Sequence, residues 1–215
     1  MTSVVARLLS EFRRPWIRIL DHPFLISLYR GDLPIENFKS YLGQDYLYLL
    51  SLLRGLSSLA SRIEEGDLLE FLGLFREEAI VEVERELSLM KSLGMAVDEL
   101  EPCPTTLAYS SFVLSRCCYD TPGRALLSVT PCFLSYLQAF ERHSHLLEHN
   151  ENELYRSLLQ GHGSEEYREI VSTLLRMIDR YVAEIGMMER RVFLQGIRYE
   201  FLFWEMAYKG EEWPF

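Results

Sequence analysis

Apolar residues recur at helical spacing through most of the chain, and the clearest example covers residues 35–63. Successive members are three, four or seven residues apart, the spacing of a helix with one buried stripe; they include Phe38, Tyr41, Tyr48, Leu52, Leu56 and Leu59. Asp45 falls within this stripe, four residues after Tyr41 and three before Tyr48. Because a bare buried charge is very unfavourable, we expect Asp45 to be hydrogen-bonded, charge-paired or facing a cavity.

Further helices are predicted along the chain, separated by proline, glycine and asparagine. They cover residues 4–20 (interrupted at Pro15), 23–30 (ended by Gly31), 67–93 (stopped at Gly94), a segment that begins at Thr105 or Thr106 and ends near Tyr119, and residues 124–148 (with Pro131 inside), 153–160, 164–185 and 186–208. No region shows the alternation of a strand or a hairpin signal. The sequence therefore predicts an all-α multi-helix bundle, with residues 1–215 forming a single domain.

Composition and charge narrow the functional class. A content of 48% hydrophobic and 13% aromatic residues is typical of a folded globular protein. The net charge of -10 argues against a nucleic-acid partner and weakly against anionic membranes. No apolar run approaches the roughly 18 residues that span a bilayer, and the N-terminus lacks a signal-peptide core. We therefore expect a cytoplasmic protein that binds neither nucleic acid nor membrane.

Three polar groups interrupt apolar helical faces and are candidates for chemistry: Asp45, Cys132 and Glu200. Cys132 follows Pro131 directly, and a proline inside a helix removes a backbone hydrogen bond and can open space beside the next side chain. Each group also has an inert interpretation. A buried cysteine usually behaves as a small hydrophobic residue. The carboxylates would be structural if they capped a neighbouring helix or paired with Arg54 or Arg198.

Other polar features give weaker signals. His145 and His149 have the i,i+4 spacing of metal ligands, but residues 143–149 are interpreted as an exposed helix end, so no metal site is predicted. Cys103, Cys117 and Cys118, like Cys132, show no CxxC spacing and are expected to be reduced. The acidic run over residues 77–86 is interpreted as a solvated face. No glycine-rich phosphate loop is present.

Three blocks of sequence resemble the TenA family of thiaminase II proteins: HPFLISLYRGDLPIENFKSYLGQDYLYL at residues 22–49, TPCFLSY at residues 130–136 and YEFLFWEMAY at residues 199–208. Their order and separation also match, and the resemblance covers nearly the whole chain. It implies a heme-oxygenase-like all-α bundle, in agreement with the helical prediction, and a homo-oligomer, commonly a tetramer.

The resemblance also implies a pocket for an aminopyrimidine, the ring portion of thiamin. At the matching positions, Asp45 would hold a ring nitrogen and the exocyclic amine, Cys132 would add to the ring, and Glu200 would transfer a proton at a ring nitrogen. The pocket is expected to be shaped by aromatic residues, which are Tyr48, Tyr109, Tyr136 and Phe203. Adding a thiolate to an aromatic ring requires protonation of the ring as the nucleophile attacks, so this set is chemically coherent and requires no metal or organic cofactor.

Two segments depart from the family pattern. Gly161-His162-Gly163 stands where the family often has a loop tyrosine that is thought to assist the nucleophile, so His162 is predicted to occupy that place in the pocket. Tyr136-Leu137-Gln138-Ala139 replaces a YxEI-like pattern that carries an acidic residue. A histidine titrates near neutral pH and can transfer protons there.

The leading hypothesis is therefore an aminopyrimidine aminohydrolase or thiaminase II, a hydrolase that cleaves a C–N bond in thiamin salvage. Its partner would be a small-molecule aminopyrimidine or thiamin. One alternative is a non-catalytic pyrimidine- or thiamin-binding relative, or a regulatory protein. A redox enzyme of the same fold, acting on haem or a quinone precursor, ranks below both. His22 precedes a proline at a helix start, and the later histidines are predicted to be exposed.

Overall fold

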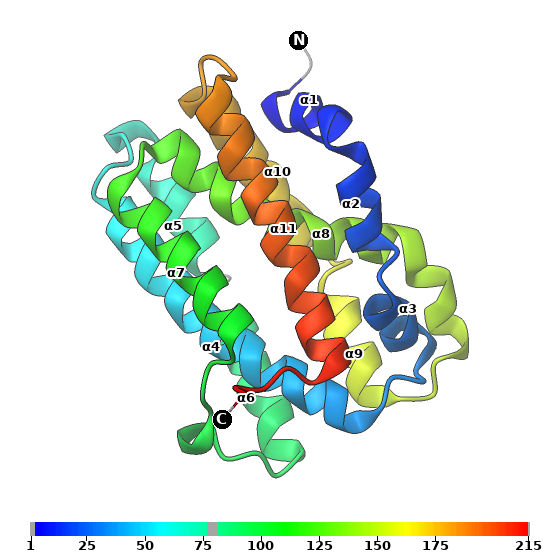
Figure 1. Ribbon diagram of the computed structural model, residues 1–215. Coiled ribbons are helices and arrows are strands. Elements are labelled where there is room, and N and C mark those ends of the chain that lie inside the picture. The colour runs from blue at the N-terminus through cyan, green and yellow to red at the C-terminus, as the bar shows by residue number, and fades with distance from the viewer. Residues whose placement is uncertain (1–2, 77–80, 215) are drawn as a thin grey trace.

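The computed structural model describes residues 3–76 and 81–214, apart from the side chain of Phe75, and every regular element in those ranges is a helix. The α-helices are α1 (Val4–Glu11), α2 (Arg13–Leu20), α3 (Pro23–Arg30), α4 (Ile35–Ala60), α5 (Leu68–Arg76), α6 (Val83–Ser92), α7 (Pro104–Tyr119), α8 (Pro122–His143), α9 (Glu153–Gly161), α10 (Glu165–Tyr181) and α11 (Met187–Lys209) (Figure 1). Short 3-10 turns lie at Glu65–Asp67, Val97–Glu99 and Ser144–His149. The all-α prediction is confirmed.

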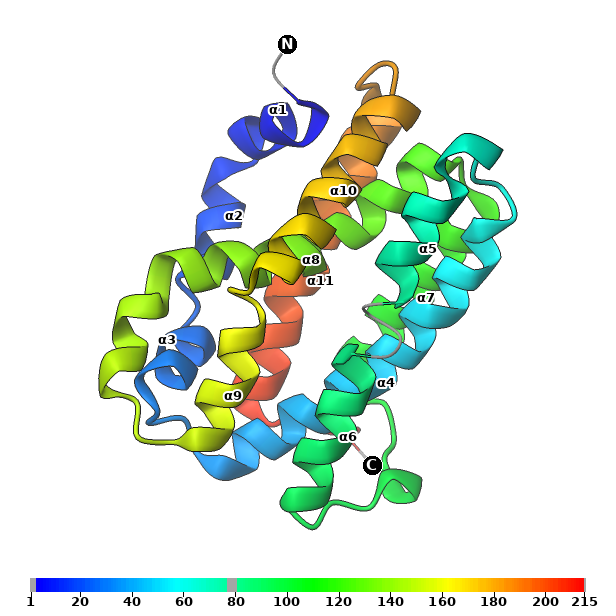
Figure 2. The same ribbon diagram turned by 180° about the vertical axis from the view of Figure 1, so that it is seen from behind.

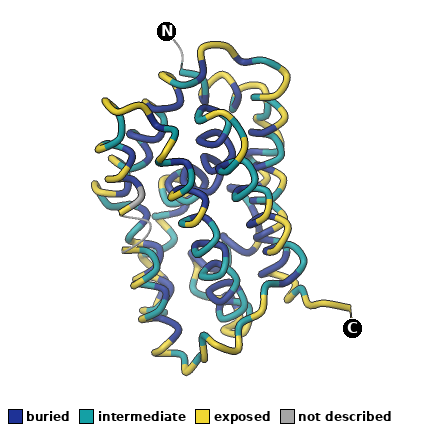
Figure 3. Tube along the Cα trace, turned by 90° about the vertical axis from the view of Figure 1, so that its left-hand side faces the viewer, coloured by how far each residue is buried: buried dark blue, intermediate teal, exposed yellow. Residues whose placement is uncertain are grey.

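The long helices form the frame of the bundle. Helix α4 lies alongside α7, and α11 runs next to both; α8 packs against α7, α10 and α11, as the two opposite views show (Figures 1 and 2). Shorter helices α1 to α3 cover one side of this frame, and α5 and α6 lie along α4. Buried positions face inward along the long helices, whereas exposed positions gather on the outer faces (Figure 3). The candidate residues of α4, α8 and α11 therefore point into one core.

Local sequence explains where several helices begin and end. Helix α3 begins with Pro23, and the Nδ1 atom of His22 accepts a hydrogen bond from the backbone of Phe24 at 3.1 Å. A proline fits the first helical position because its missing N–H would have no partner there. The helix ends as predicted at Gly31, whose φ of 87° is a left-handed conformation that glycine adopts without steric strain.

The break in the first predicted helix was placed at the wrong residue. Helices α1 and α2 are separated at Phe12, while Pro15 lies inside the first turn of α2. The first-turn N–H groups of a helix have no intrahelical acceptor, so proline at this position removes no helical bond.

Two other predicted boundaries differ from the structure. The single helix over residues 67–93 is described as α5 and α6, with residues 77–80 outside the described part of the chain. The N-cap of helix α7 is Cys103, two residues before Thr105 and three before Thr106, and Pro104 occupies the first helical position. Within the described residues, no helix combines the length and apolar character of a membrane span.

Helices α8 and α11 approach closely at the middle of the bundle. A Cβ atom built on Gly196 of α11 would lie 2.8 Å from Cγ of Pro131 and 3.2 Å from the carbonyl oxygen of Ser128. A glycine at this position therefore lets α11 lie directly against the turn of α8 that precedes Cys132. This contact fixes the relative position of Cys132 and of Glu200, which lies one helical turn beyond Gly196.

Candidate active site

Asp45, Cys132 and Glu200 lie on three different helices, α4, α8 and α11, and all three are buried. They are also electrostatically close. The charge of Asp45 raises the pKa of Glu200, and charges at both Cys132 and Glu200 raise the pKa of the Tyr48 phenol, which is also raised, more strongly, by burial. Segments that are distant in sequence thus bring three titratable side chains within electrostatic reach of one another and of Tyr48.

Glu200 is the best-defined group of the site. The hydroxyl of Tyr109 donates to Oε2 at 3.0 Å, and the hydroxyl of Ser135 donates to Oε1 at 2.7 Å. Burial raises the pKa of Glu200 to about 7, although both hydrogen bonds act in the opposite direction. A carboxyl group with such a pKa can either give or accept a proton near neutral pH.

Asp45 accepts hydrogen bonds from two phenols. The Tyr41 hydroxyl lies 2.7 Å from Oδ2, the Tyr136 hydroxyl lies 3.3 Å from the same atom, and the two hydroxyls are 2.8 Å apart. Burial raises the pKa of Asp45, and these bonds partly offset that effect. The inert alternative of pairing with Arg54 does not hold, because Arg54 is exposed and Asp45 has no arginine partner among the described residues.

Cys132 lies on α8 one turn before Ser135, whose hydroxyl is 3.1 Å from the Cys132 carbonyl oxygen. It forms no disulfide and is only 9% exposed. Besides burial, a charge at Cys132 raises the pKa of each of Tyr48, Tyr109 and Tyr136. Charges at Cys132 and at Glu200 therefore act on the same three phenols, which the sequence assigned to the pocket.

Aromatic rings line the space between these groups. The rings of Tyr48 and Tyr109 are 4.6 Å apart between centroids, and Phe203 lies 6.0 Å from Tyr48 and 6.3 Å from Tyr109. Tyr136 packs edge-on against Trp204 at 5.2 Å. Such flat, rigid walls suit a planar heterocycle and exclude water, which strengthens the polar contacts to a ligand.

His162 lies at the end of α9 against the same pocket. Its ring centroid is 4.5 Å from that of Tyr136, and its Nε2 atom is 4.0 Å from Oε2 of Glu82. Burial, with a smaller contribution from the charge of Arg85, lowers the pKa of His162 to about 3. The ring thus packs against Tyr136, and because of this pKa the imidazole is neutral near pH 7 and does not titrate there.

The prediction of a solvated acidic face over residues 77–86 was wrong for two of its members. Glu86 is 1% exposed, and Glu82 is largely covered and pairs with Arg85 at 2.6 Å. Glu84, between them, is exposed, whereas Glu77 and Glu78 lie outside the described residues. Residues four apart share one face of a helix, so Glu82 and Glu86 point inward together.

The histidine-rich segment was also only partly predicted. His145 and His149 are exposed, but His143 is buried and its Nε2 atom lies 2.8 Å from the carbonyl oxygen of Leu20. A satisfied core histidine explains this position. No group of three or more His, Cys, Asp or Glu side chains in the described ranges is arranged to hold a metal ion.

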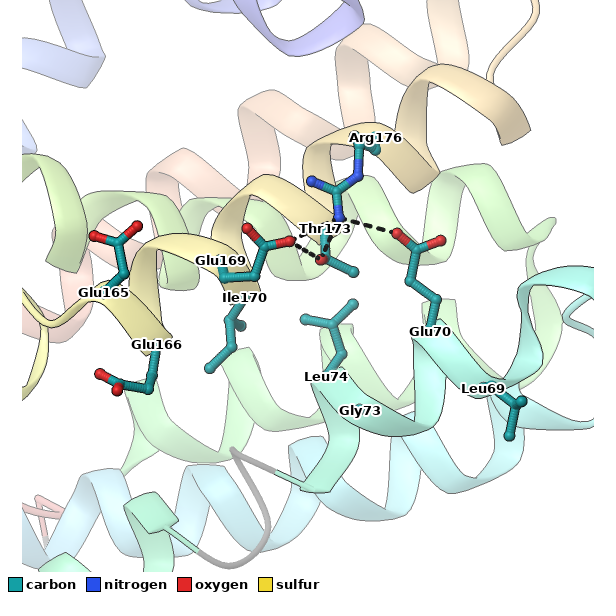
Figure 4. A pocket seen from close by; sticks show the side chains of 10 residues that line it. All are labelled: Leu69, Glu70, Gly73, Leu74, Glu165, Glu166, Glu169, Ile170, Thr173 and Arg176. Carbon is teal, nitrogen blue, oxygen red and sulfur yellow. Dashed lines mark hydrogen bonds and ion pairs between the residues drawn. The ribbon is translucent and has the colours of Figure 1, made fainter.

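A separate surface groove of about 540 Å³ lies between α5 and α10 (Figure 4). Arg176 crosses it, with Nη2 at 3.1 Å from Glu70 and 3.0 Å from Glu169, and also contacts Thr173. None of the sequence-predicted site residues lines this groove. Its arginine already has acidic partners, so we do not assign it to the candidate chemistry.

Sequence reasoning missed two residues that hold the site together. Tyr41 was assigned to the apolar stripe, yet its hydroxyl is the nearest donor to Asp45. Ser135 was not singled out, yet it is the nearest donor to Glu200. Helical spacing carried a signal for both, because Tyr41 lies four residues before Asp45 and Ser135 lies three residues after Cys132.

Comparison with known proteins identifies the family of the chain. The model of the TENA/THI-4/PQQC family matches residues 10–210. The chain belongs to the TENA/THI-4/PQQC family. A relative from Halalkalibacterium halodurans, named aminopyrimidine aminohydrolase, is 28% identical over 224 residues and is matched over 99% of each chain.

Solved structures support the fold. A TenA homologue from P. horikoshii OT3 is 33% identical and superposes with a TM-score of 0.91, covering 97% of this chain and 100% of the other. A Shewanella denitrificans domain of unknown function with a heme oxygenase-like fold covers 96% of this chain and 92% of its own, at 13% identity and a TM-score of 0.75. The heme-oxygenase-like fold predicted from the sequence is confirmed.

Proposed function

We propose that this TenA-family protein is an aminopyrimidine aminohydrolase, which replaces the amine on the methylene carbon of a 4-amino-2-methylpyrimidine by a hydroxyl group. One observation carries the proposal. Glu200 is held by Tyr109 and Ser135 with a pKa of about 7, on the helix that packs against the Cys132-bearing α8. The name of the Halalkalibacterium halodurans relative, aminopyrimidine aminohydrolase, supports the choice of substrate class.

Binding of the pyrimidine would use Asp45 and the aromatic walls. The carboxylate of Asp45, oriented by the Tyr41 hydroxyl, accepts from the exocyclic amine and fixes the ring edge. The ring then lies among the planes of Tyr48, Tyr109 and Phe203, where water is excluded. Hydrogen bonds to a carboxylate are strongest when the pair is shielded from solvent.

The proposed chemical steps assign the nucleophile to Cys132 and the proton transfer to Glu200. The thiolate of Cys132 forms a C–S bond to a ring carbon while Glu200 gives its proton to the adjacent ring nitrogen. The lone pair of that nitrogen then expels the amine, whose C–N bond breaks and leaves an exocyclic methylene group. Water adds its oxygen to this carbon and gives one proton to the departed amine. Sulfur then departs with the C–S electrons, and Glu200 regains its proton from the ring nitrogen.

A second candidate is a protein that binds the same pyrimidine without turnover. The observation that favours it is the pKa of His162, about 3, because a histidine that takes the part of the family's assisting tyrosine would then offer no proton near neutral pH. Binding without product formation, unaffected by a change at Cys132, would support this candidate.

Product formation separates the two candidates. The purified protein would be incubated with 4-amino-5-aminomethyl-2-methylpyrimidine and, in parallel, with thiamin. The Cys132→Ser variant is compared with Cys118→Ser, which changes a cysteine on α7 away from the pocket. Hydrolysis that is lost in Cys132→Ser and retained in Cys118→Ser supports the hydrolase. Tight binding of the pyrimidine without any product supports the binding protein.

A further inference from the structure

The imidazole of His22 has no part in the proposed reaction steps, yet the residue is only 2% exposed. We propose that this imidazole is a positioning residue for pyrimidine binding, because it fixes the aromatic side chains that orient Asp45. The inference rests on the proposed function and adds a residue to the binding half of the same site.

His22 is held in one tautomer at the start of α3. Its Nδ1 atom accepts a hydrogen bond from the backbone N–H of Phe24 at 3.1 Å, so Nδ1 carries no proton and the ring proton lies on Nε2. The first N–H groups of a helix have no acceptor within the helix, and this bond satisfies one of them. Pro23 has no N–H, so Phe24 is the first residue of α3 that can be held in this way.

A continuous series of ring contacts runs from the capped residue to Asp45. The ring of Phe24 is stacked on Trp204, with 5.4 Å between centroids and 16° between planes, and it lies 5.3 Å from the ring of Tyr41. Trp204 in turn lies 5.9 Å from Tyr41 and 5.2 Å from Tyr136. These two tyrosines are the phenols whose hydroxyls donate to Oδ2 of Asp45.

Trp204 depends on these rings for its orientation. Its indole Nε1 atom is buried and has no hydrogen-bond partner among the described residues, although a buried indole N–H usually has one. Packing alone therefore fixes the plane of the indole, and the nearly parallel contact is the stack on Phe24. A shift of Phe24 would change how Trp204 packs against both tyrosines, and with it the two hydrogen bonds that orient Asp45.

Protonation of His22 would break the cap. A second proton can bind only at Nδ1, the atom that the N–H of Phe24 already faces, and two N–H groups cannot hydrogen-bond to each other. The neutral imidazole is thus the form that holds Phe24 in place. Acid should release this contact and weaken the binding of the pyrimidine.

The surroundings of the imidazole favour this neutral form. Burial lowers the pKa of His22 below its ordinary value of 6.5, and the charge of Glu205, whose Oε1 lies 3.5 Å from Nε2, partly offsets that effect. The charges of Lys209 and Arg18 lower the pKa further. Two aromatic rings of α11 also meet the imidazole edge-on, those of Phe201 and Tyr208.

Kinetics of two substitutions at position 22 tests the inference. Asparagine is a preferred N-cap residue whose amide oxygen can accept the same hydrogen bond without titrating, whereas alanine removes the acceptor. At pH 8, His22→Asn should keep a KM for 4-amino-5-aminomethyl-2-methylpyrimidine close to that of wild type. His22→Ala should raise KM by about 2- to 30-fold, the factor that corresponds to one N-cap bond. It should change kcat much less, because Asp45 binds the substrate and the reacting groups are unaltered.

The pH profile separates a positioning role from a merely structural one. As the pH falls below 6.5, KM should rise further in wild type than in His22→Asn, because only the imidazole loses its acceptor on protonation. Asp45 and Glu200 titrate in both proteins, so the difference between the two profiles belongs to position 22. Ser3→Ala is the matched control. It removes a cap bond of the same kind, to the backbone of Ala6 at 3.2 Å, from α1, which carries none of the proposed site residues, and it should leave KM unchanged.

The outcomes are separable from those of the proposed function. An unchanged KM in His22→Ala, or KM profiles of wild type and His22→Asn that coincide from pH 8 to pH 5, would overturn the positioning role and leave the hydrolase intact. If wild type binds the pyrimidine without turnover, the hydrolase proposal fails, and dissociation constants from calorimetry replace KM in the same comparison. If wild type neither binds nor converts the pyrimidine, both proposals fail together. Circular dichroism checks the folding of each variant, and the comparison of wild type with His22→Asn across pH decides the inference without the alanine variant.

Discussion

The hydroxyl of Ser135 lies 2.7 Å from Oε1 of Glu200. Ser135 is one turn after Cys132 on α8, so the helix that carries the proposed nucleophile also holds the proposed acid. Nucleophilic addition and ring protonation must occur together for an aromatic ring to accept a thiolate. A rigid link between the two helices keeps the sulfur and the carboxyl group in a fixed relative position. That link depends on the close contact of the two helices, which Gly196 allows.

Removing this hydroxyl should shift the pH dependence of the reaction. The Ser135 bond lowers the pKa of Glu200 by stabilising its ionised form, so Ser135→Ala should move the corresponding inflection of the kcat–pH profile upward by about one pH unit. Ser128→Ala is the control, because the Ser128 hydroxyl is also buried on α8 but donates to the carbonyl of Ala125. An unchanged profile in Ser135→Ala would show that Glu200 does not set the observed inflection.

Glu200 should also make folding stability depend on pH. Its native pKa, about 7, lies above its ordinary value of 4.5, so the native state binds more protons than the unfolded state between these values. The free energy of unfolding should therefore fall as the pH rises from about 4.5 to 7, by up to roughly 3 kcal/mol from this group. Below about pH 4.5, Glu200 is protonated in both the native and the unfolded state, so this group no longer lowers the free energy of unfolding.

Denaturant unfolding of wild type and Glu200→Gln at pH 5 and pH 8 measures this contribution. Glutamine cannot ionise, so the variant should gain stability relative to wild type on going from pH 5 to pH 8, whatever the other groups contribute to both proteins. A stability difference between the two proteins that is the same at both pH values would contradict the raised pKa.

Selective alkylation should report the environment of Cys132. Cys117 is fully buried and its pKa is raised to about 12 by burial, and burial also raises the pKa of Cys103. A thiolate reacts with iodoacetamide far faster than a thiol, so in a Cys118→Ser background Cys132 should label first. The hydroxymethyl or aminomethyl pyrimidine should slow that labelling, as measured by peptide mass spectrometry. Equal labelling at Cys103, Cys117 and Cys132 without protection would remove Cys132 as the nucleophile.

The spacing of apolar residues predicted the fold well, because the burial of apolar side chains determines which face of each helix turns inward. Helices α3, α4 and α11 were predicted within a few residues, since each has a continuous apolar stripe and clear proline or glycine boundaries. The break at Phe12 was missed because a proline in a first turn looks the same in sequence as a proline that ends a helix. Asp45 and Glu200 were identified as buried because a single carboxyl group inside an apolar stripe is conspicuous.

Glu82 and Glu86 were not identified, and the reason is physical. They lie in a run of acidic residues, and within such a run a solvated member cannot be distinguished by type from a buried one. Their burial depends on Asp45 and His162, which come from α4 and the end of α9. Only the assembled bundle brings these segments together, so helical periodicity could not predict the burial of Glu82 and Glu86.

The close contact of α8 and α11 gives a prediction that links stability to the site. In Gly196→Ala the new methyl group would lie 2.8 Å from Cγ of Pro131, which is part of a buried helix turn and has little room to move. Overpacking of this kind typically lowers the free energy of unfolding by about 1–3 kcal/mol, and here it should also displace Cys132 and lower kcat.

The matched control is Gly73→Ala on α5, where a Cβ meets no atom within 4 Å. Alanine at that exposed helical position should raise stability by about 0.5–1 kcal/mol and leave activity unchanged. Chemical denaturation and steady-state kinetics of both variants measure the two effects. If Gly196→Ala were as stable and as active as wild type, α8 and α11 could move apart without loss of stability or activity. The prediction that this contact couples Cys132 to Glu200 would then be wrong.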